Sequence, residues 1–297
     1  MIDLHTHSNM SDGIFSPIEL INEARKQGLS AIALTDHDTI GGLENAKNES
    51  KTTGIKFIPG IEISIKWTGT PSLGHGGEMH LLGLGIFKPS NEFLSAIAEL
   101  SMRRETRNKE ILRRMNDLKI EADWNEVAIS PSHSVGRLHF ADFLVKKNIV
   151  KNRQQAFARF LSAGKPLFVP KDGMDFKTAV SLIRESGGIP ILAHPMSLFI
   201  SRSRLPDMIM SLKKLGLAGL EAWHPSAKVN NCRFLEKLAE KSGLYITEGS
   251  DFHGAFQKNS KRKNYSESRQ LGFSHKDRKI NDSILEVIPE LMTEKNN

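Results

Sequence analysis

The chain has a single cysteine, Cys232, among its 297 residues. One cysteine excludes an internal disulfide framework and a cysteine-based zinc site, and it is typical of a reducing compartment. Any metal ligands must therefore be histidine, aspartate or glutamate. The chain also lacks an apolar run long enough to cross a bilayer, and Asp3 and His5 interrupt the first residues where a signal peptide would be apolar. We expect a cytoplasmic protein that makes no membrane contact.

The rest of the composition is that of an ordinary globular protein, with 39% hydrophobic and 25% charged residues. A chain of this length can bury one large α/β domain or a barrel that carries an insertion. Most of the net charge of +7 lies in residues 99–170, which hold 14 Lys and Arg against 8 Asp and Glu, and a second basic run extends from Lys258 to Lys263. Basic surface suits an anionic substrate, including nucleic acid, although charge runs are more often solvated helix faces.

Apolar runs and helical patterns alternate along both ends of the chain. Strands are expected at 1–5, 31–34, 56–65, 189–193, 217–223 and 244–247, the third of them broken at Pro59-Gly60. Helices are expected in between, and the first begins with a capping box formed by Ser16 and Glu19. This alternation predicts an α/β fold with a parallel sheet, arranged as a (β/α) barrel.

Residues 91–165 interrupt the alternation. Apolar residues between Phe93 and Leu118 recur at helical spacing, and further apolar clusters between Phe140 and Leu161 indicate additional helices. We therefore expect a helical insertion domain at 99–168 that binds the substrate. It separates a first part of the barrel, residues 1–98, from a second part, residues 169–297.

Residues that bind divalent metals follow or open each expected strand. They are His5, His7, Asp12, His37, Glu62, His80, His194, Asp251 and His253. A barrel brings the carboxyl ends of its parallel strands to one rim, so these side chains are expected to converge. His80 is an exception because it opens its apolar run, which predicts a locally antiparallel strand or a distorted barrel.

Nine nitrogen and oxygen donors exceed the number that one tetrahedral ion needs. We therefore predict two or three divalent ions, with the Glu62 carboxylate bridging two of them. Paired ions roughly 3.5–4 Å apart can hold both the attacking and the leaving oxygen of a phosphoester, and a bound water with a pKa near 7 then serves as nucleophile. The pattern predicts a metal-dependent phosphoester hydrolase. A lone histidine at a strand end is more often structural, and His75, His133 and His275 are assigned to that class.

Taken together, the motifs resemble the polymerase-and-histidinol-phosphatase (PHP) family. The resemblance runs in order from residue 1 to about 254 and rests on His5-Thr6-His7-Ser8, Ser11-Asp12-Gly13, Thr35-Asp36-His37-Asp38, Gly60-Ile61-Glu62, His80, His194-Pro195 and Ser250-Asp251-Phe252-His253-Gly254. It implies a distorted (β/α)7 barrel and a trinuclear site that manganese, iron or zinc would fill. By this resemblance one ion is held by His5, His7, Glu62 and Asp251, a second by Glu62, His80 and His194, and a third by Asp12, His37 and His253.

Three segments narrow the resemblance to the subgroup that dephosphorylates nucleoside 3′,5′-bisphosphates and trims RNA from its 5′ end. They are Gly136-Arg137-Leu138-His139, the run 163–170 with Gly164-Lys165-Pro166, and Glu221-Ala222-Trp223-His224-Pro225-Ser226. The resemblance implies that Arg137 and Lys165 bind phosphate, while His139 and His224 contact the substrate or deliver a proton. The residues expected to be catalytic are Glu62, His194, His224 and Asp251.

Three other functions compete with this hypothesis. A small-metabolite phosphatase of the histidinol-phosphate type would not need the basic insertion. A non-catalytic PHP scaffold has no chemical reason to keep a complete donor set. A nucleic-acid-binding module would explain Arg103, Arg107 and Arg114 on the first insertion helix, but not the histidines. The expected partner is a nucleotide or a short RNA, and the sequence implies no obligate protein partner.

Overall fold

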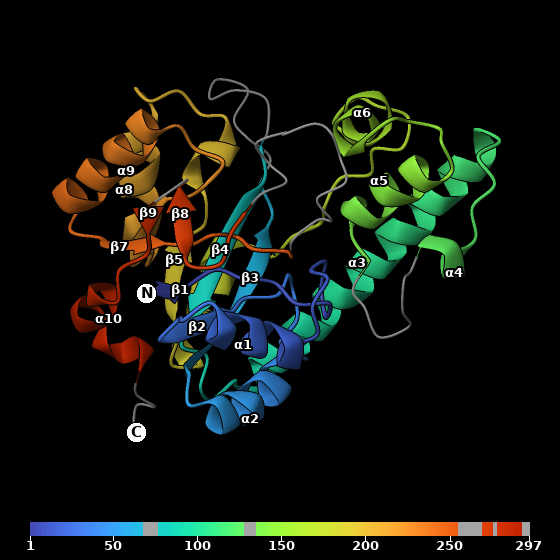
Figure 1. Cartoon of the computed structure of the whole chain (residues 1–297). Coiled ribbons are helices and arrows are strands. Elements are labelled where there is room, and N and C mark those ends of the chain that lie inside the picture. Colours follow the sequence, from blue (N-terminus) through green and yellow to red (C-terminus); the bar gives the residue numbers. More distant parts are fainter. Residues whose placement is uncertain (68–76, 128–134, 255–268, 276–277, 293–297) are drawn as a thin grey trace.

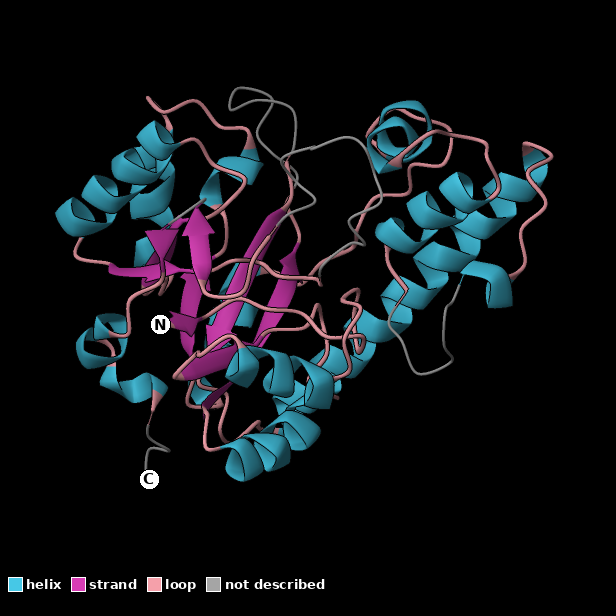
Figure 2. Cartoon of the chain, viewed as in Figure 1, coloured by secondary structure: helices cyan, strands magenta, loops and turns pink. Residues whose placement is uncertain are grey.

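The computed structural model describes residues 1–67, 77–127, 135–254, 269–275 and 278–292. It consists of a barrel surrounded by helices and a helical part to one side of it (Figures 1 and 2). The basic run from Lys258 to Lys263, together with His75 and His133, lies outside the described residues.

Seven strands form one sheet in the order of the chain. They are β1 (Ile2–Asp3), β2 (Ala31–Leu34), β3 (Lys56–Ile65), β4 (Met79–Leu84), β5 (Ile189–Leu192), β6 (Gly219–Trp223) and β7 (Tyr245–Glu248). The backbone beyond β7 returns to the backbone beyond β1, because Thr6 and Phe252 form a parallel bridge and the N–H of His7 donates to the carbonyl of Phe252 at 2.9 Å. The predicted barrel is therefore confirmed, and its two outer strands meet at the rim.

Strand β4 is the distortion in this barrel. It is antiparallel to β3 on one side and to β5 on the other, whereas the remaining pairs are parallel. The antiparallel strand that His80 predicted is therefore present. Since β4 runs the opposite way, its first residues reach the same rim as the last residues of its neighbours, and His80 lies beside Ser64 of β3.

The predicted break at Pro59-Gly60 is wrong, because β3 continues through both residues. The strand changes partners there: it pairs with β2 as far as Pro59 and with β4 from Gly60 onward. The carbonyl of Pro59 accepts hydrogen bonds from Gly85 and Ile86 at 2.8 and 2.9 Å. A Cβ at Gly60 would lie 2.9 Å from the side chain of Thr35, so the close approach of the strands favours glycine.

Helices cover the outside of the barrel (Figure 2). They are α1 (Pro17–Lys26), α2 (Leu43–Thr53), α7 (Phe176–Glu185), α8 (Leu205–Lys214) and α9 (Val229–Ser242). The capping box of α1 is present, with the Ser16 hydroxyl accepting from the Glu19 N–H and the Glu19 carboxylate accepting from the Ser16 N–H. Shorter elements complete the chain: η2 (Pro195–Leu198), β8 (Phe273–His275), β9 (Arg278–Lys279), α10 (Ser283–Val287) and η3 (Pro289–Leu291).

The helical part contains α3 (Asn91–Asp117), α4 (Trp124–Val127), α5 (Arg137–Lys146), α6 (Arg153–Ala156) and the π-helical turn η1 (Phe157–Leu161). Helix α3 extends from the barrel into this part (Figure 1). Its first turns pack Phe93 and Ile97 into the barrel core, and its last turns pack Ile111 and Met115 into a separate core with α5. Among the described helices, none combines the length and the apolar character that crossing a bilayer requires.

Candidate metal centre

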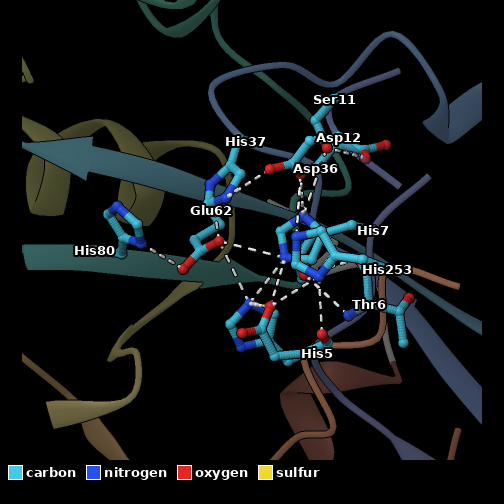
Figure 3. A network of polar contacts seen from close by, with 12 residues as sticks. His5, Thr6, His7, Ser11, Asp12, Asp36, His37, Glu62, His80 and His253 are labelled. Atoms are coloured by element: carbon cyan, nitrogen blue, oxygen red, sulfur yellow. Dashed lines mark hydrogen bonds and ion pairs between the residues drawn. The ribbon is translucent and has the colours of Figure 1, made fainter. Parts of the chain in front are cut away.

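The nine predicted donors come together at the rim of the barrel. Figure 3 labels His5, His7, Asp12, His37, Glu62, His80 and His253 among them. Three groups have ligand atoms that all lie within 4.8 Å of one another: His5, His7, Glu62 and Asp251; His7, Asp12, His37 and His253; and His37, Glu62 and His80. His194 joins them, because its Nε2 atom lies 2.9 Å from Oε1 of Glu62 and 3.3 Å from Nδ1 of His80. The groups overlap, and Glu62 lies between them.

Local backbone geometry presents these side chains. His5 and His7 are two residues apart on extended backbone, and their Nε2 atoms lie 3.1 Å from each other. The turns after β5 and β7 place His194 and Asp251 at positive φ angles of 29° and 52°, a backbone conformation that residues other than glycine rarely adopt. Backbone strain of this kind concentrates at functional sites.

The described donors fit divalent cations. Oδ1 of Asp12, Nδ1 of His37 and Oε2 of Glu62 are buried and make no hydrogen bond among the described residues. Nδ1 of His37 nevertheless lies 2.9 Å from Oε2 of Glu62, and Nε2 of His253 lies 3.1 Å from Oδ1 of Asp12. A cation held between such atoms would satisfy lone pairs that these close contacts leave without a hydrogen bond. Mixed imidazole and carboxylate donors suit zinc, iron and manganese.

The carboxylates of the centre are held in the ionised form. Burial by itself would raise the pKa of Glu62, but the charges of His37, His80 and His5 outweigh it and hold that pKa well below its ordinary range. The pKa of Asp12 is lowered in the same way by His253 and His37. Burial and the charge of His253 lower the pKa of His7 to about 3, so this imidazole is neutral. Ionised carboxylates and neutral imidazoles are the forms that ligate metals, so a cation would displace the protons of His5 and His253, whose pKa values the neighbouring carboxylates raise against the effect of burial.

Carboxylates behind the donors fix them in place. Oε1 of Glu221 lies 2.8 Å from Nδ1 of His5, and its other oxygen accepts from the N–H of His194 at 2.7 Å. Asp36 accepts from the N–H and hydroxyl of Ser8, which ties the loop after β1 to the end of β2. Both carboxylates occur in the motifs of the sequence, but the motifs predicted no role for them. Their signal in the sequence is an acidic residue inside or directly after an apolar strand.

Two basic side chains also reach the centre, and sequence reasoning missed both. Arg269 donates to the carbonyl of Asp251 at 2.7 Å and also to its carboxylate. Nζ of Lys171 lies 3.1 Å from Nε2 of His80 and 2.7 Å from a carboxylate oxygen of Glu78. No periodicity or motif in the sequence distinguishes either residue.

Two of the residues predicted to contact the substrate, His224 and Arg137, lie next to the metal centre. Nε2 of His224 lies 3.1 Å from Oδ2 of Asp251, so this residue borders the centre. Arg137 forms an ion pair with Glu78, whose other oxygen lies 3.6 Å from His80. Arg137 is therefore one carboxylate away from the donors.

The contacts of His139 and Lys165 that follow are made within the helical part and not with the metal donors. Nδ1 of His139 accepts from the N–H of Gly136 at 3.0 Å, which caps helix α5. Lys165 is exposed in the turn after η1, and its backbone N–H donates to Ser162. Within the described part of the chain, no polar contact joins the Lys165 side chain to the cluster.

Comparison with known proteins agrees with this geometry. The PHP domain family matches residues 3–159. A 5′-3′ exoribonuclease from Haemophilus influenzae is 34% identical over 84% of this chain and 89% of that protein. A 3′,5′-nucleoside bisphosphate phosphatase from Chromobacterium violaceum is 30% identical over 85% of this chain and 87% of that protein. A solved Bifidobacterium adolescentis structure, provisionally named a metal-dependent phosphoesterase, has a TM-score of 0.81 at 25% identity and covers 99% of this chain and 96% of that one.

The family that the motifs predicted is therefore confirmed, and the fold agrees with that of the solved Bifidobacterium adolescentis structure along nearly the whole chain. The relatives carry the phosphatase and exoribonuclease names of the predicted subgroup. On the extent of these matches, the chain belongs to the PHP domain family.

Proposed function

We propose that this chain hydrolyses phosphoesters of nucleotides, as a nucleoside 3′,5′-bisphosphate phosphatase, a 5′-3′ exoribonuclease or both. The observation that carries the proposal is the set of three overlapping donor groups with Glu62 between them. The names of two relatives, each similar over more than four fifths of the chain, support nucleotides as the substrate class. The basic charge of residues 99–170 suits such anions.

The proposal includes two or three divalent ions, with manganese as the first to test and iron and zinc as alternatives. His5, His7, Glu62 and Asp251 would hold one ion, Glu62, His80 and His194 a second, and Asp12, His37 and His253 a third. When bound, such ions polarise the phosphoester and lower the pKa of water so that it serves as the nucleophile. The overlap of the groups at Glu62 supports more than one ion.

The chain's own residues orient these donors and move protons. His224 is buried, which lowers its pKa, whereas Glu221 and Asp251 favour the protonated form that a proton donor needs. Its contact with Asp251 and its Nδ1 contact with Ser226 at 2.6 Å fix the ring. We propose that His224 protonates the leaving oxygen. It is favoured over His139 because its Nε2 atom contacts the proposed ligand Asp251, whereas Nδ1 of His139 accepts from the backbone N–H of Gly136. Glu62, His194 and Asp251 complete the proposed catalytic set.

The helical insertion at 99–168 is the proposed substrate-binding domain, with Arg137 closest to the centre. Lys165 is exposed, which suits contact with a longer RNA rather than with the reacting phosphate. We also keep a cytoplasmic location as part of the proposal, since a single cysteine is typical of a reducing compartment.

The test incubates manganese-loaded protein with a short 5′-phosphorylated RNA and, separately, with adenosine 3′,5′-bisphosphate. Stepwise release of mononucleotides from the RNA establishes the exoribonuclease. Phosphate release from the bisphosphate alone establishes a phosphatase. Turnover of neither substrate with manganese, iron or zinc, while the donors bind metal, would contradict the proposed function.

A further inference from the structure

Four of the nine proposed metal ligands lie at the seam where the barrel closes, between β1 and β7. These strands are the first and the last in the order of the sheet, and within the described residues no ladder of hydrogen bonds joins them. Just beyond the strands, the N–H groups of His7 and Ile14 donate to the carbonyls of Phe252 and His253, both at 2.9 Å. Because this backbone pairing is short, other contacts must fix the distance between the two sides of the seam.

The metal centre depends on that distance. His5 and His7 lie on the β1 side of the seam, and Asp251 and His253 lie on the β7 side. Oδ1 of Asp251 lies 3.5 Å from Nε2 of His5 and 3.2 Å from Nε2 of His7. The rings of His7 and His253 stack with their centroids 4.2 Å apart (Figure 3). These four side chains can share ions only while the two sides stay this close.

The carboxylate of Asp3 joins the two sides. Its Oδ1 atom accepts from the N–H of His5 at 3.2 Å and from the N–H of Ser250 at 3.1 Å. Its Oδ2 atom accepts from the hydroxyl of Ser250 at 2.5 Å and from the N–H of Gly272 at 2.7 Å. Ser250 directly precedes Asp251. Asp3 therefore fixes the backbone of a proposed ligand on one side and of the neighbour of a ligand on the other.

Asp3 is an unusual residue for its position. It is fully buried in β1 between Ile2 and Leu4, which are equally buried. Within the described residues, its four contacts are with N–H and hydroxyl groups, and none is with a basic side chain. A buried carboxylate without a cation opposes folding, so its presence in an apolar strand indicates a functional requirement.

The C-terminal segment, by which we mean the described residues from 269 to 292, also contacts both sides of the seam. On the β1 side, the carbonyl of Ile280 accepts from the N–H of Ile2 at 3.1 Å. On the β7 side, Arg269 donates to the carbonyl of Asp251 at 2.7 Å. The contact between Asp3 and this segment therefore connects three parts of the chain that each reach the metal centre.

We propose that Asp3 is a positioning residue for the metal centre, which sets the distance between the ligands on the two sides of the seam. It acts through the backbone of both sides and through the C-terminal segment, and it contacts neither ion nor substrate. The inference rests on the proposed function, because it concerns the metal centre of that function. Ions whose proposed ligands lie on both sides should depend on Asp3, whereas the ion of Glu62, His80 and His194 should not.

Asp3→Asn tests this proposal. Each oxygen of Asp3 accepts from at least one backbone N–H, so the amide nitrogen of asparagine would face an N–H group in either orientation. Metal-free protein is prepared with a chelator and titrated with manganese in a calorimeter. Asp3→Asn should weaken at least one binding step by about 10- to 100-fold, the usual effect of altering a residue that orients ligands, and leave one step unchanged.

Ser250→Ala separates the position of the ligands from the charge of Asp3. It removes one hydrogen bond, keeps the carboxylate and leaves the N–H of residue 250 in place. It should weaken the same binding step by a smaller factor. If Asp3→Asn does not fold, Ser250→Ala decides the question alone.

Cobalt gives a spectroscopic readout of ligand geometry without turnover. The visible absorption of the cobalt-loaded protein should change in Asp3→Asn and in Ser250→Ala. Asp175→Asn is the matched control, because Asp175 accepts from the N–H and hydroxyl of Thr178 at 3.1 and 3.2 Å at the exposed start of α7. Ile209→Val, a buried change on α8, lowers stability without touching the seam. Both controls should keep the manganese affinity and the cobalt spectrum of the wild type.

Wild-type affinity and spectrum in Asp3→Asn and Ser250→Ala, with a lower melting temperature in chelator, would show that Asp3 only stabilises the fold. An equal loss of affinity in Ile209→Val would trace the effect to stability and would also overturn the proposal. Both outcomes leave the proposed function intact. If the wild type binds neither manganese nor cobalt, the proposed function itself fails, so the two failures are distinguishable.

Discussion

Nδ1 of His5 lies 2.8 Å from Oε1 of Glu221, and both side chains are buried. The second oxygen of Glu221 accepts from the backbone N–H of His194. One carboxylate on β6 therefore fixes the ring of one proposed ligand and the backbone of another, across three strands of the barrel. Burial by itself would raise the pKa of Glu221, but the charges of His5 and His224 lower it, so the carboxylate is ionised at neutral pH.

We expect Glu221→Gln to weaken metal binding by about 10- to 100-fold, the usual effect of removing a carboxylate that orients a ligating histidine. The measurement is a manganese titration followed by activity at saturating metal. Glu240→Gln, an exposed change on α9, is the matched control. An affinity equal to that of the wild type would show that Glu221 does not orient His5.

Glu62→Ala should abolish turnover and metal loading together. Glu62 is fully buried and belongs to two of the three donor groups, so its loss affects both. Metal content is measured by elemental analysis of the purified variant, and circular dichroism checks the fold. Glu62→Gln, which keeps the shape but not the charge, should retain the fold and lose most of the metal. A fully active variant without metal would rule out the proposed chemistry.

The positions of most donors could be predicted from the sequence because they follow or open an apolar strand, whereas Glu62 lies within β3 and Asp12 lies in the loop after β1. An apolar run such as 31–34 identifies a strand. The residues that follow it then lie at the rim, because the carboxyl ends of the parallel strands of a barrel all face that rim. The antiparallel strand was also predictable, because His80 opens its apolar run instead of closing it.

The supporting residues could not be predicted, because their roles depend on contacts between distant segments. Lys171 lies in a turn without periodicity, and only the fold brings it to His80. Arg107 was grouped with Arg103 and Arg114 on a basic face of the first insertion helix, but its side chain is buried, at 7% exposure. The gap in the apolar pattern of α3 between Leu100 and Ile111 is the signal that would have found it.

Arg137→Ala should raise the KM for the bisphosphate by about ten-fold and leave the metal content unchanged, because Arg137 contacts Glu78 rather than a donor. Lys146→Ala removes one exposed positive charge from the same helix and serves as the control. Steady-state kinetics and elemental analysis are done on the same preparations. Loss of the ions from Arg137→Ala would assign this residue to the support of the metal centre instead.

The ion pair between Asp38 and Arg104 predicts a stability that depends on pH. Burial by itself would raise the pKa of Asp38, but the charge of Arg104 and the N–H of Ser64 outweigh it and lower that pKa from 3.8 to about 2. The folded pKa is below the unfolded one, so the stabilisation is present above about pH 4 and is lost as the pH falls toward 2. The shift corresponds to about 2 kcal/mol.

Asp38→Asn should therefore lower the free energy of unfolding by about 2 kcal/mol at pH 7, and the difference from the wild type should shrink below pH 4. Urea unfolding in the presence of a chelator measures this difference without a contribution from metal release at acid pH. Asp117→Asn, at an exposed position on α3, should change stability by less than about 0.5 kcal/mol. A difference that stays constant from pH 7 to pH 3 would mean that the charge of Asp38 does not stabilise the fold. The stabilisation would then come from the hydrogen bonds that Asp38 accepts from Ser64, which an asparagine side chain reproduces only in part.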